Sequence, residues 1–389
     1  MKSIVNYPHL SIFVLAWFVA DLLIPCLIWA GHRVGILDRP GGHKGQKIPV
    51  PFLGGVGIFV AFTVSVCSTL RFESLESLLP FVGVIFGGAV VVTLGFIDDI
   101  KPINAIVKLA VLFATTLVLA FFGITINLFP TVLWNLPNIL LTLFWIVGVT
   151  SAKNSLDNTD GVAGGVAALT GLFVFAIAWG TSPADAQPWL SYLAVALVGS
   201  CCGFLRYNLP PARIYLGDNG SFFLGYILAT LLVFCKYSTD PLKAVIVPCL
   251  ILSVPIYDIA LATILRIRDG DVRNWRDAVL YCGRDHLAHL LMGLRFSKRV
   301  TVCFIYSLTI IGGVTALLVM NATHPALYLA ITGTYVSFLV GISIVLGRVR
   351  RQVLRETHYL PRDNDPGKDP EPKPPAKRPL PTRGLVSQD

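Results

Sequence analysis

The chain has 389 residues, of which 54% are hydrophobic and only 14% are charged, and its formal net charge is +9. Soluble globular proteins carry about a quarter of charged residues, so this composition excludes an ordinary soluble domain. The Lys and Arg residues are divided among many loops and form no compact basic patch with interleaved aromatic residues. We therefore expect a protein embedded in a lipid bilayer, with no nucleic-acid partner.

Apolar stretches of about 20 residues, the length that crosses the hydrocarbon core of a bilayer, recur along the chain. The first is too long for the apolar region of a signal peptide and is interpreted as a retained span. The expected fold class is all-α, a polytopic membrane protein with about 11 transmembrane helices. The predicted spans are residues 10–30, 52–70, 81–97, 105–122, 136–151, 162–180, 189–205, 221–235, 244–265, 300–319 and 326–346.

Basic residues predict the orientation of these spans. If the N-terminus is outside, the external segments hold only Lys2, Arg71, Lys236 and Lys243, while Lys108 lies inside a span. All other Lys and Arg residues are then cytosolic, as the positive-inside rule requires. The C-terminus is predicted to be cytosolic too. The predicted cytosolic loops are residues 31–51, 98–104, 152–161, 206–220 and 266–299.

The chain divides into a membrane domain and a tail. Residues 1–346 are predicted to form one transmembrane domain with its polar motifs in the cytosolic loops. Residues 347–389 are basic and rich in proline, with few apolar residues, and are predicted to be a disordered cytosolic tail. Arginines at its start are expected to contact anionic lipid headgroups. These arginines are Arg348, Arg350, Arg351 and Arg355.

The first two loops carry lysines and an acidic pair. Lys44 and Lys47 precede a Pro- and Gly-rich entry to the second span, where they could bind phosphate or act only as membrane anchors. Asp98 and Asp99 end an otherwise apolar span in G-F-I-D-D-I. Adjacent carboxylates at a membrane edge are costly unless they are paired, hydrated or bound to a cation. The alternative is a simple acidic helix end.

The third loop, N-S-L-D-N-T-D-G, brings Asn154, Asp157, Asn158 and Asp160 to the start of a span. If the segment is helical, Asp157 and Asp160 share one face. The EF-hand pattern and its terminal Glu are absent, which argues against a calcium loop. N-capping could explain one of these residues but hardly four.

The fourth loop places Asp218 between Gly217 and Asn219, before a helix expected to begin at Ser221. A carboxylate there can ligate Mg²⁺ while helix N-terminal amides face phosphate oxygens, although an N-cap is the simpler alternative. The fifth loop mixes arginines, Arg266 among them, with His286 and His289. Two histidines at this spacing could bind zinc, but the surrounding arginines favour contacts to a phosphorylated substrate over a metal. A structural histidine pair remains the alternative.

All five motifs are expected at one membrane face. Carboxylates with flanking lysines and arginines are the groups that hold Mg²⁺ and neutralise a pyrophosphate during phosphoryl transfer. The order K…P-x-x-G-G, D-D, N-x-x-D-N-x-D-G, G-D-x-G-S and H-x-x-H, between residues 31 and about 346, resembles the polyprenyl-phosphate N-acetylhexosamine-1-phosphate transferases. These enzymes are glycosyltransferases of family 4, and the likeness is to the undecaprenyl-phosphate N-acetylglucosaminyl 1-phosphate transferase type.

The resemblance implies a multi-pass enzyme of the bacterial inner membrane with its active site facing the cytosol. Such an enzyme moves N-acetylhexosamine-1-phosphate, GlcNAc-1-phosphate by default, from a UDP-N-acetylhexosamine to undecaprenyl phosphate. It releases UMP and initiates O-antigen or another cell-wall glycan. Mg²⁺, or Mn²⁺, is the implied cofactor, and a homodimer is one expectation for the assembly.

The resemblance also assigns roles to residues. It implies catalytic roles for Asp98, Asp99 and Asp160, and a metal site at Asp218 and Asp99. Together with the chemistry of the loops, it predicts that substrate is bound by Lys44, Lys47, Asn154, Asp157, Asn158, Arg266, His286 and His289. Two positions depart from the family pattern, because Gln46 and Ala288 stand where histidines are usual.

Three alternatives remain open at this stage. A UDP-muramoyl-pentapeptide phosphotransferase of peptidoglycan synthesis shares the aspartates but has a richer histidine loop. A secondary transporter would place ionisable residues near mid-bilayer, and Asp21, Lys108 and Asp258 do fall within predicted spans. A scaffold for polysaccharide assembly would not need the loop aspartates.

Overall fold

The computed structural model describes residues 8–38, 48–69, 75–130, 135–180, 188–272, 283 and 285–356. These residues are mostly helical, and two short strands, β1 (Leu37–Asp38) and β2 (Val50–Pro51), form an antiparallel ribbon. The helices are α1 (Pro8–Val34), α2 (Gly54–Thr69), α3 (Leu75–Ile100), α4 (Ala105–Phe121), α5 (Leu136–Leu156), α6 (Val162–Gly180), α7 (Pro188–Asn208), α8 (Gly217–Phe234), α9 (Pro241–Ile251), α10 (Ser253–Asp269), α12 (Leu287–Gly293), α13 (Lys298–Asn321) and α14 (Pro325–Glu356).

The predicted all-α, polytopic membrane fold is confirmed. Among the described residues, eight helices are long and apolar enough to cross a membrane, and α9 with α10 makes a ninth if this bent pair is one span. The helices α2 and α4 are shorter and apolar. Each of the predicted spans therefore corresponds to a helix or to the bent pair. The total of eleven spans and the orientation of the spans in the membrane remain predictions.

The span predicted over residues 244–265 is broken at Leu252, where α9 and α10 meet at an angle of 79°. Prolines explain the break. Pro248 lies within α9, and Pro255 lies in the first turn of α10, where it has no N–H to donate to the carbonyl of Ile251. Proline also disfavours the helical conformation of the residue before it.

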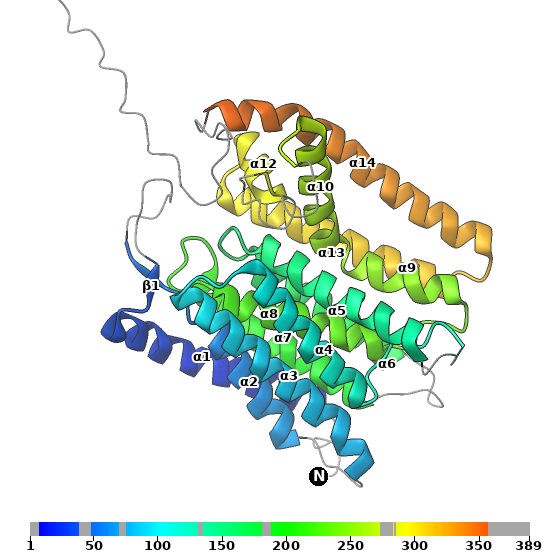
Figure 1. Cartoon of the computed structure of the whole chain (residues 1–389), viewed down its shortest axis with the longest axis horizontal. Coiled ribbons are helices and arrows are strands. Elements are labelled where there is room, and N and C mark those ends of the chain that lie inside the picture. The colour runs from blue at the N-terminus through cyan, green and yellow to red at the C-terminus, as the bar shows by residue number, and fades with distance from the viewer. Residues whose placement is uncertain are drawn as a thin grey trace, which may run out of the picture.

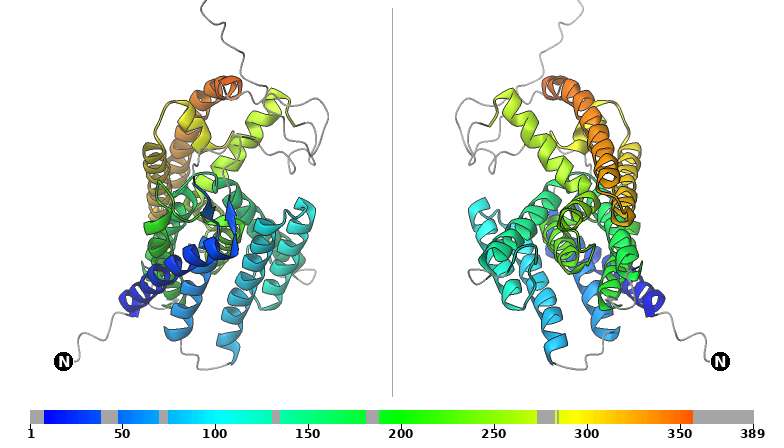
Figure 2. Two further views of the ribbon diagram at one scale, coloured as in Figure 1. Left: turned by 90° about the vertical axis from the view of Figure 1, so that its left-hand side faces the viewer. Right: turned by 90° about the vertical axis from the view of Figure 1, so that its right-hand side faces the viewer.

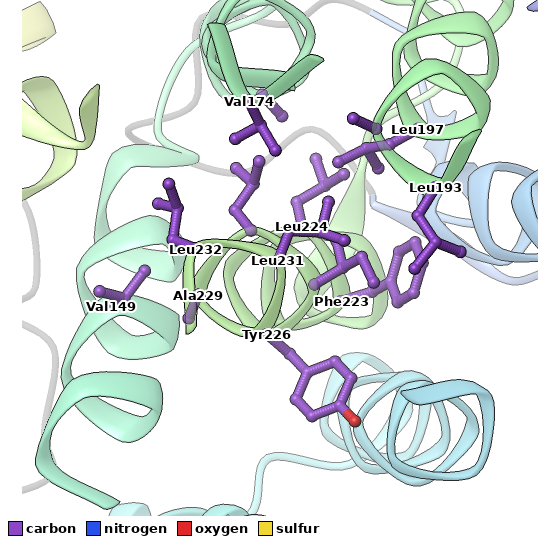
Figure 3. Packing of buried hydrophobic residues seen from close by; sticks show 14 of the residues in the cluster. Val149, Val174, Leu193, Leu197, Phe223, Leu224, Tyr226, Ala229, Leu231 and Leu232 are labelled. Carbon is purple, nitrogen blue, oxygen red and sulfur yellow. The ribbon is translucent and has the colours of Figure 1, made fainter. Parts of the chain in front are cut away.

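Helix α8 is the centre of the bundle. Its side chains are buried continuously from Asn219 to Leu232, because α3 and α5 pack against it along with α2 and α6. Figure 3 shows Val149 of α5, Val174 of α6 and Leu197 of α7 around it. A helix that is apolar on every side belongs in a protein interior. The G-D-N-G-S motif that opens α8 is therefore fixed to the most buried element of the fold.

A second, smaller core joins α10, α12, α13 and the end of α14. These elements gather at one end of the molecule, beyond the bundle of α1–α8 (Figures 1 and 2). Helix α14 continues to Glu356, past the predicted domain end at residue 346. Arg350 is wholly buried and therefore does not contact lipid headgroups, which corrects the prediction for this residue. Residues 357–389, where disorder is predicted, lie outside the described residues.

Candidate active site

Asp98 is held near the end of α3 by one amide and one lysine. Its Oδ1 accepts a hydrogen bond from the Ile103 N–H at 2.6 Å, and its Oδ2 accepts one from Lys108 Nζ at 2.7 Å. Lys108 comes from the first turns of α4, which the short connection after α3 folds back alongside it. From the sequence, Lys108 was only a lysine inside a span. Its place opposite the acidic pair makes it a site residue that the sequence reasoning missed.

Asp99 points to the start of α8. Its Oδ1 accepts from the Asp218 N–H at 2.9 Å, and its Oδ2 accepts from Asn219 N–H at 3.1 Å and Asn219 Nδ2 at 2.6 Å. The first amides of a helix lack partners within the helix and carry partial positive charge. Asp99 therefore caps α8 and fixes the position of Asp218.

Asn219 ties three helices together at this point. It is fully buried, its Nδ2 also donates to Phe52 O at 2.8 Å, and its Oδ1 accepts from the Val56 N–H at 3.0 Å. Glycines make this approach close: a Cβ on Gly95 of α3 would lie 2.3 Å from Asn219 N, and one on Gly55 of α2 would lie 2.1 Å from Gly220 Cα. The sequence signal for this contact, which was missed, is Asn219 close to Gly217 and Gly220.

Asp218 lies in the first turn of α8, since the helix begins at Gly217 and not at the predicted Ser221. Its Oδ2 is 3.9 Å from Lys108 Nζ, and the same Nζ is 2.7 Å from Asp98 Oδ2, so the two carboxyl groups lie beside one lysine. Two carboxylates this close repel each other unless they share a proton or a cation. Asp98 and Asp218 thus form a pair of oxygen donors with one lysine beside them.

This carboxylate pair fits Mg²⁺, the cofactor that the family resemblance implies. The described residues contain no group of three or more acidic, His or Cys side chains arranged to hold a metal. Mg²⁺ does not need such a cage, because it keeps several waters and is usually held by one or two carboxylates together with substrate phosphates. Asp98 and Asp218 lie together beside Lys108 and match that mode of binding, whereas Asp99 accepts three hydrogen bonds from the start of α8.

The third motif reaches the same place from the end of α5. Asn154 Oδ1 accepts a hydrogen bond from Ser221 Oγ of α8 at 2.5 Å. Residues 157–161 form a turn between α5 and α6, so Asp157 and Asp160 do not share a helix face. Burial raises the pKa of Asp157 to about 7, against the opposing effect of Lys153. Asn158 closes the turn by donating from Nδ2 to Ser155 O at 3.1 Å.

Two further lysines contact this motif. Lys153, a fully buried residue that the sequence reasoning missed, donates from Nζ to Ala163 O of α6 at 2.5 Å. Lys298, at the start of α13, lies 3.2 Å from Asp160 Oδ2. Lys153 therefore joins α5 to α6 on either side of the turn, and Lys298 joins the turn itself to α13.

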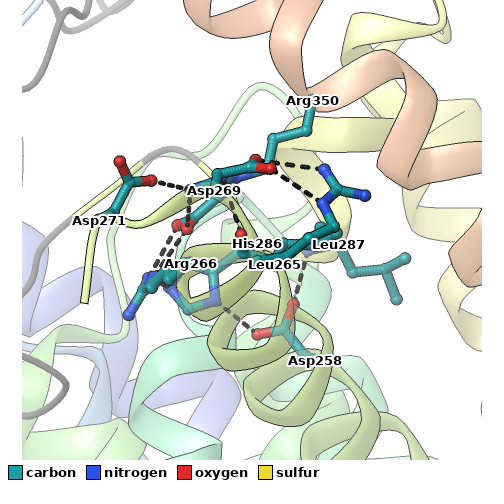
Figure 4. A network of polar contacts seen from close by, with 10 residues as sticks. Asp258, Leu265, Arg266, Asp269, Asp271, His286, Leu287 and Arg350 are labelled. Carbon is teal, nitrogen blue, oxygen red and sulfur yellow. Dashed lines mark hydrogen bonds and ion pairs between the residues drawn. The ribbon is translucent and has the colours of Figure 1, made fainter. Parts of the chain in front are cut away.

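The fifth loop forms a second polar cluster. Arg266 of α10 donates from Nε to Asp285 Oδ2 at 2.7 Å and from a terminal nitrogen to Asp285 Oδ1 at 2.8 Å. The same nitrogen is 3.3 Å from His286 Nε2, and His286 Nδ1 is 2.8 Å from Asp258 Oδ2 (Figure 4). Arg266 and His286 are thus neighbours, and their role in substrate binding stays a prediction.

Three of the predicted substrate-binding residues remain. His289 is half-buried on α12, and Ala288 beside it is wholly buried in the second core. Lys44 and Lys47 lie outside the described residues. The three ionisable residues that fell within predicted spans all have partners: Asp21 binds Arg206 at 2.8 Å, Lys108 binds Asp98, and Asp258 binds His286.

A large, mostly apolar pocket of about 1120 Å³ lies between α5 and the bent pair α9–α10, and residues 123–128 and 232–239 also line it. Its walls include Phe144 and Trp145 of α5, Val245 of α9 and Ile256 of α10. Phe144 is 76% exposed, so the pocket is open on an outer, apolar face of the bundle. At the other end it reaches Ala152, close in the chain to Asn154.

Fold and site together define a multi-pass membrane protein that gathers carboxylates and lysines at its helix ends and also holds a large, mostly apolar pocket. Residues 81–236 match glycosyl transferase family 4, a segment that contains Asp98, Asp99, Lys108, the third motif and Asp218. The family predicted from the motifs is confirmed, and this chain contains the family 4 region.

Several curated proteins are similar to the chain over much of its length. One is the "probable undecaprenyl-phosphate N-acetylglucosaminyl 1-phosphate transferase" of Bacillus subtilis, 28% identical over 90% of this chain and 95% of that protein. A decaprenyl-phosphate N-acetylglucosaminephosphotransferase of Mycobacterium tuberculosis is 28% identical over 70% of this chain and 73% of its own length. A phospho-N-acetylmuramoyl-pentapeptide-transferase of Bacillus velezensis is 28% identical over 61% and 76%, respectively.

Proposed function

We propose that this protein transfers N-acetylglucosamine-1-phosphate from a UDP-sugar to undecaprenyl phosphate. The observation that carries the proposal is the meeting of Asp98, Lys108, Asp218 and Asn154 at the helix ends. The names of the relatives from Bacillus subtilis and Mycobacterium tuberculosis support the same reaction class.

The reaction exchanges one phosphoanhydride for another. An oxygen of the lipid phosphate attacks the phosphorus that bears the sugar, the bond from that phosphorus to the UMP oxygen breaks, and UMP leaves. Since the lipid phosphate is already an anionic nucleophile, the protein has mainly to position two anions and neutralise them. Lys108 supplies positive charge at this point, and Asp98 orients its ammonium group.

Asp98 and Asp218 are proposed to hold Mg²⁺, with Asn154 as a neighbouring oxygen donor from α5. A bound Mg²⁺ neutralises the pyrophosphate and polarises its phosphoryl oxygens. Asp99 is proposed to act by capping α8, because its oxygens accept three hydrogen bonds from Asp218 and Asn219. The two adjacent aspartates therefore have different tasks.

The acceptor chain is proposed to lie in the pocket between α5 and α9–α10. The pocket has an apolar wall suited to a polyisoprenoid, and its end at Ala152 would direct the phosphate toward Asn154 and Asp218.

The donor is proposed to contact Arg266 and His286, whose side-chain nitrogens lie 3.3 Å apart at the fifth loop. Mn²⁺ could replace Mg²⁺ at a site made of oxygen donors.

UDP-GlcNAc is the proposed donor. The relative from Bacillus subtilis matches 90% of the chain, whereas the muramoyl-pentapeptide transferase matches 61%. The buried Ala288, in place of a family histidine, also departs from the histidine-rich loop expected of the latter enzyme. The proposed location is the bacterial inner membrane, with the site facing the cytosol and the product serving O-antigen or other cell-wall glycan synthesis. The homodimer also stays a prediction.

Purified protein in detergent is expected to transfer label from radiolabelled UDP-GlcNAc to undecaprenyl phosphate and to release UMP. The reaction should require Mg²⁺ and stop with chelator, because the carboxylate pair needs a cation to hold a pyrophosphate. The measurement is lipid-extractable label with and without metal. Product formed only from UDP-muramoyl-pentapeptide would contradict the donor, and counterflow of a solute without any lipid-linked product would favour a transporter.

A side chain that fills the pocket is expected to raise the KM for the lipid substrate and to leave the KM for the donor unchanged. Nothing lies within 4 Å of a Cβ placed on Gly148, which lines the pocket, so Gly148→Leu extends a side chain into it. We expect the KM for undecaprenyl phosphate to rise about tenfold while the KM for UDP-GlcNAc stays unchanged. Gly341→Leu on α14 is the matched control, since its surroundings are equally open. Equal kinetics for both variants would place the lipid elsewhere.

A further inference from the structure

Arg350 is an exception on its helix. Most of α14 exposes its apolar side chains, such as Val336 and Val345, and its predicted membrane span is little buried. Near the C-terminal end, however, the Arg350 side chain is wholly buried. Burial of a guanidinium is costly unless carboxylates compensate its charge. Arg350 therefore needs an explanation beyond membrane anchoring.

Three carboxylates surround it. One terminal nitrogen of Arg350 donates to Asp269 and to Leu265 O, both on α10. The other donates to Asp271 Oδ2 at 2.7 Å and to Asp285 Oδ2 at 3.2 Å (Figure 4). The single side chain thus connects the last helix to the end of α10, to the residues that follow it and to the start of α12.

Asp285 links this network to the fifth-loop cluster. The same carboxylate that accepts from Arg350 is bound in a bidentate way by Arg266. Burial raises the pKa of Asp285, but Arg266, His286 and Arg350 outweigh it, and the pKa lies below its usual value. The carboxylate is therefore charged at neutral pH and binds both arginines.

His286 is oriented by the neighbouring contacts. Its Nδ1 lies 2.8 Å from Asp258 Oδ2, and Asp258 Oδ1 accepts from the Leu287 N–H at 2.6 Å. Any shift of Asp285 would move Arg266 and the residue next to it, His286, together. The positions of both polar groups at the loop consequently depend on a residue of α14.

We infer that Arg350 is a positioning residue: its buried pairs with Asp269, Asp271 and Asp285 hold α10 against the start of α12, so that Arg266 and His286 face the UDP-sugar in a fixed arrangement. The inference rests on the proposed function in its reference to the donor. The arrangement is not simply a means of stability, because apolar residues of similar volume often stabilise a fold as well as a buried ion pair does. The forked guanidinium instead fixes the direction of several carboxylates at once.

The test combines a structural and a kinetic measurement. In Arg350→Met, hydrogen exchange of the amides of residues 285–291 is expected to become about tenfold faster, because the loop loses its anchor. Exchange of the first amides of α8 should not change. The KM for UDP-GlcNAc is expected to rise about tenfold, with kcat and the KM for undecaprenyl phosphate within about twofold of wild type.

Controls separate this role from a general loss of stability. Arg348→Ala, on an exposed arginine of the same helix, should leave both measurements unchanged. Arg350→Lys keeps the charge without the fork and should recover only part of the donor KM. If Arg350→Met does not fold, Asp271→Asn removes one of its partners and should show the same pattern more weakly.

Each outcome decides one part of the inference. Unchanged exchange at residues 285–291 in a folded variant overturns the positioning role, whether or not the wild-type protein transfers sugar. Faster exchange with an unchanged donor KM overturns the link to the donor. A wild-type protein without transferase activity contradicts the proposed function, while the exchange measurement still tests the connection between Arg350 and the loop.

Discussion

Asp218→Asn is expected to abolish sugar-1-phosphate transfer, with a loss of at least about a thousandfold, while the protein still inserts and folds. The substitution keeps the shape of the side chain but removes its charge. Asp218 lies beside Asp98 and 3.9 Å from Lys108, and its backbone N–H, which Asp99 accepts, is unaffected. The change therefore removes one of two carboxylates available to Mg²⁺ without breaking the cap of α8.

The measurement is Mg²⁺-dependent formation of lipid-linked product, alongside the melting temperature in detergent. Asp240→Asn provides a matched control, because Asp240 also begins a helix and caps it by accepting from the Leu242 N–H at 2.9 Å, which asparagine can still do. The control should retain full activity. Turnover by Asp218→Asn that still depends on Mg²⁺ would refute the assignment of Asp218 as a metal ligand.

Gly95→Ala is expected to destabilise the protein by about 3 kcal/mol, although alanine is normally the better residue inside a helix. A Cβ on Gly95 would lie 2.3 Å from Asn219 N and 2.4 Å from the carbonyl carbon of Asp218, both of them backbone atoms. Relief of this clash requires α3 and α8 to separate. Because Asp98 and Asp99 follow on the same helix, activity should fall together with stability.

Thermal unfolding in detergent and transfer activity check this expectation. Gly333→Ala on α14 is the control, since nothing lies within 4 Å of a Cβ at that position, and its melting temperature should stay the same or rise. If Gly95→Ala melts like the wild type and remains active, the close backbone contact between α3 and α8 does not determine the geometry of the site.

The helical architecture could be predicted from the sequence, because the length of an apolar stretch is a local property that needs no knowledge of the folded structure. Each predicted span corresponds to a helix or to the bent pair, including the short helices α2 and α4. The break at Leu252 was missed, although Pro248 and Pro255 mark it, because a proline does not interrupt an apolar run. The residues of α14 beyond 346 were assigned to the tail because their composition resembles it.

Part of the candidate site could be predicted from the sequence. Acidic motifs expected on one face do meet, as Asp98, Asp218 and Asn154 show. The division of work between Asp98 and Asp99 could not be predicted, since the amides that bind Asp99 belong to a helix far away in the sequence. The partners of Lys108 and Lys153 are likewise set by packing of one helix against another. Such contacts leave no local pattern.

The pocket between α5 and the bent pair determines which measure of concentration applies to the proposed acceptor lipid. Its wall includes Phe144 and Val245, which face outward on the apolar surface of the bundle. A polyisoprenoid can enter sideways there and never passes through water. Encounter between enzyme and acceptor then takes place in two dimensions, and the quantity that governs saturation is the mole fraction of acceptor among the membrane lipids, not its amount per volume.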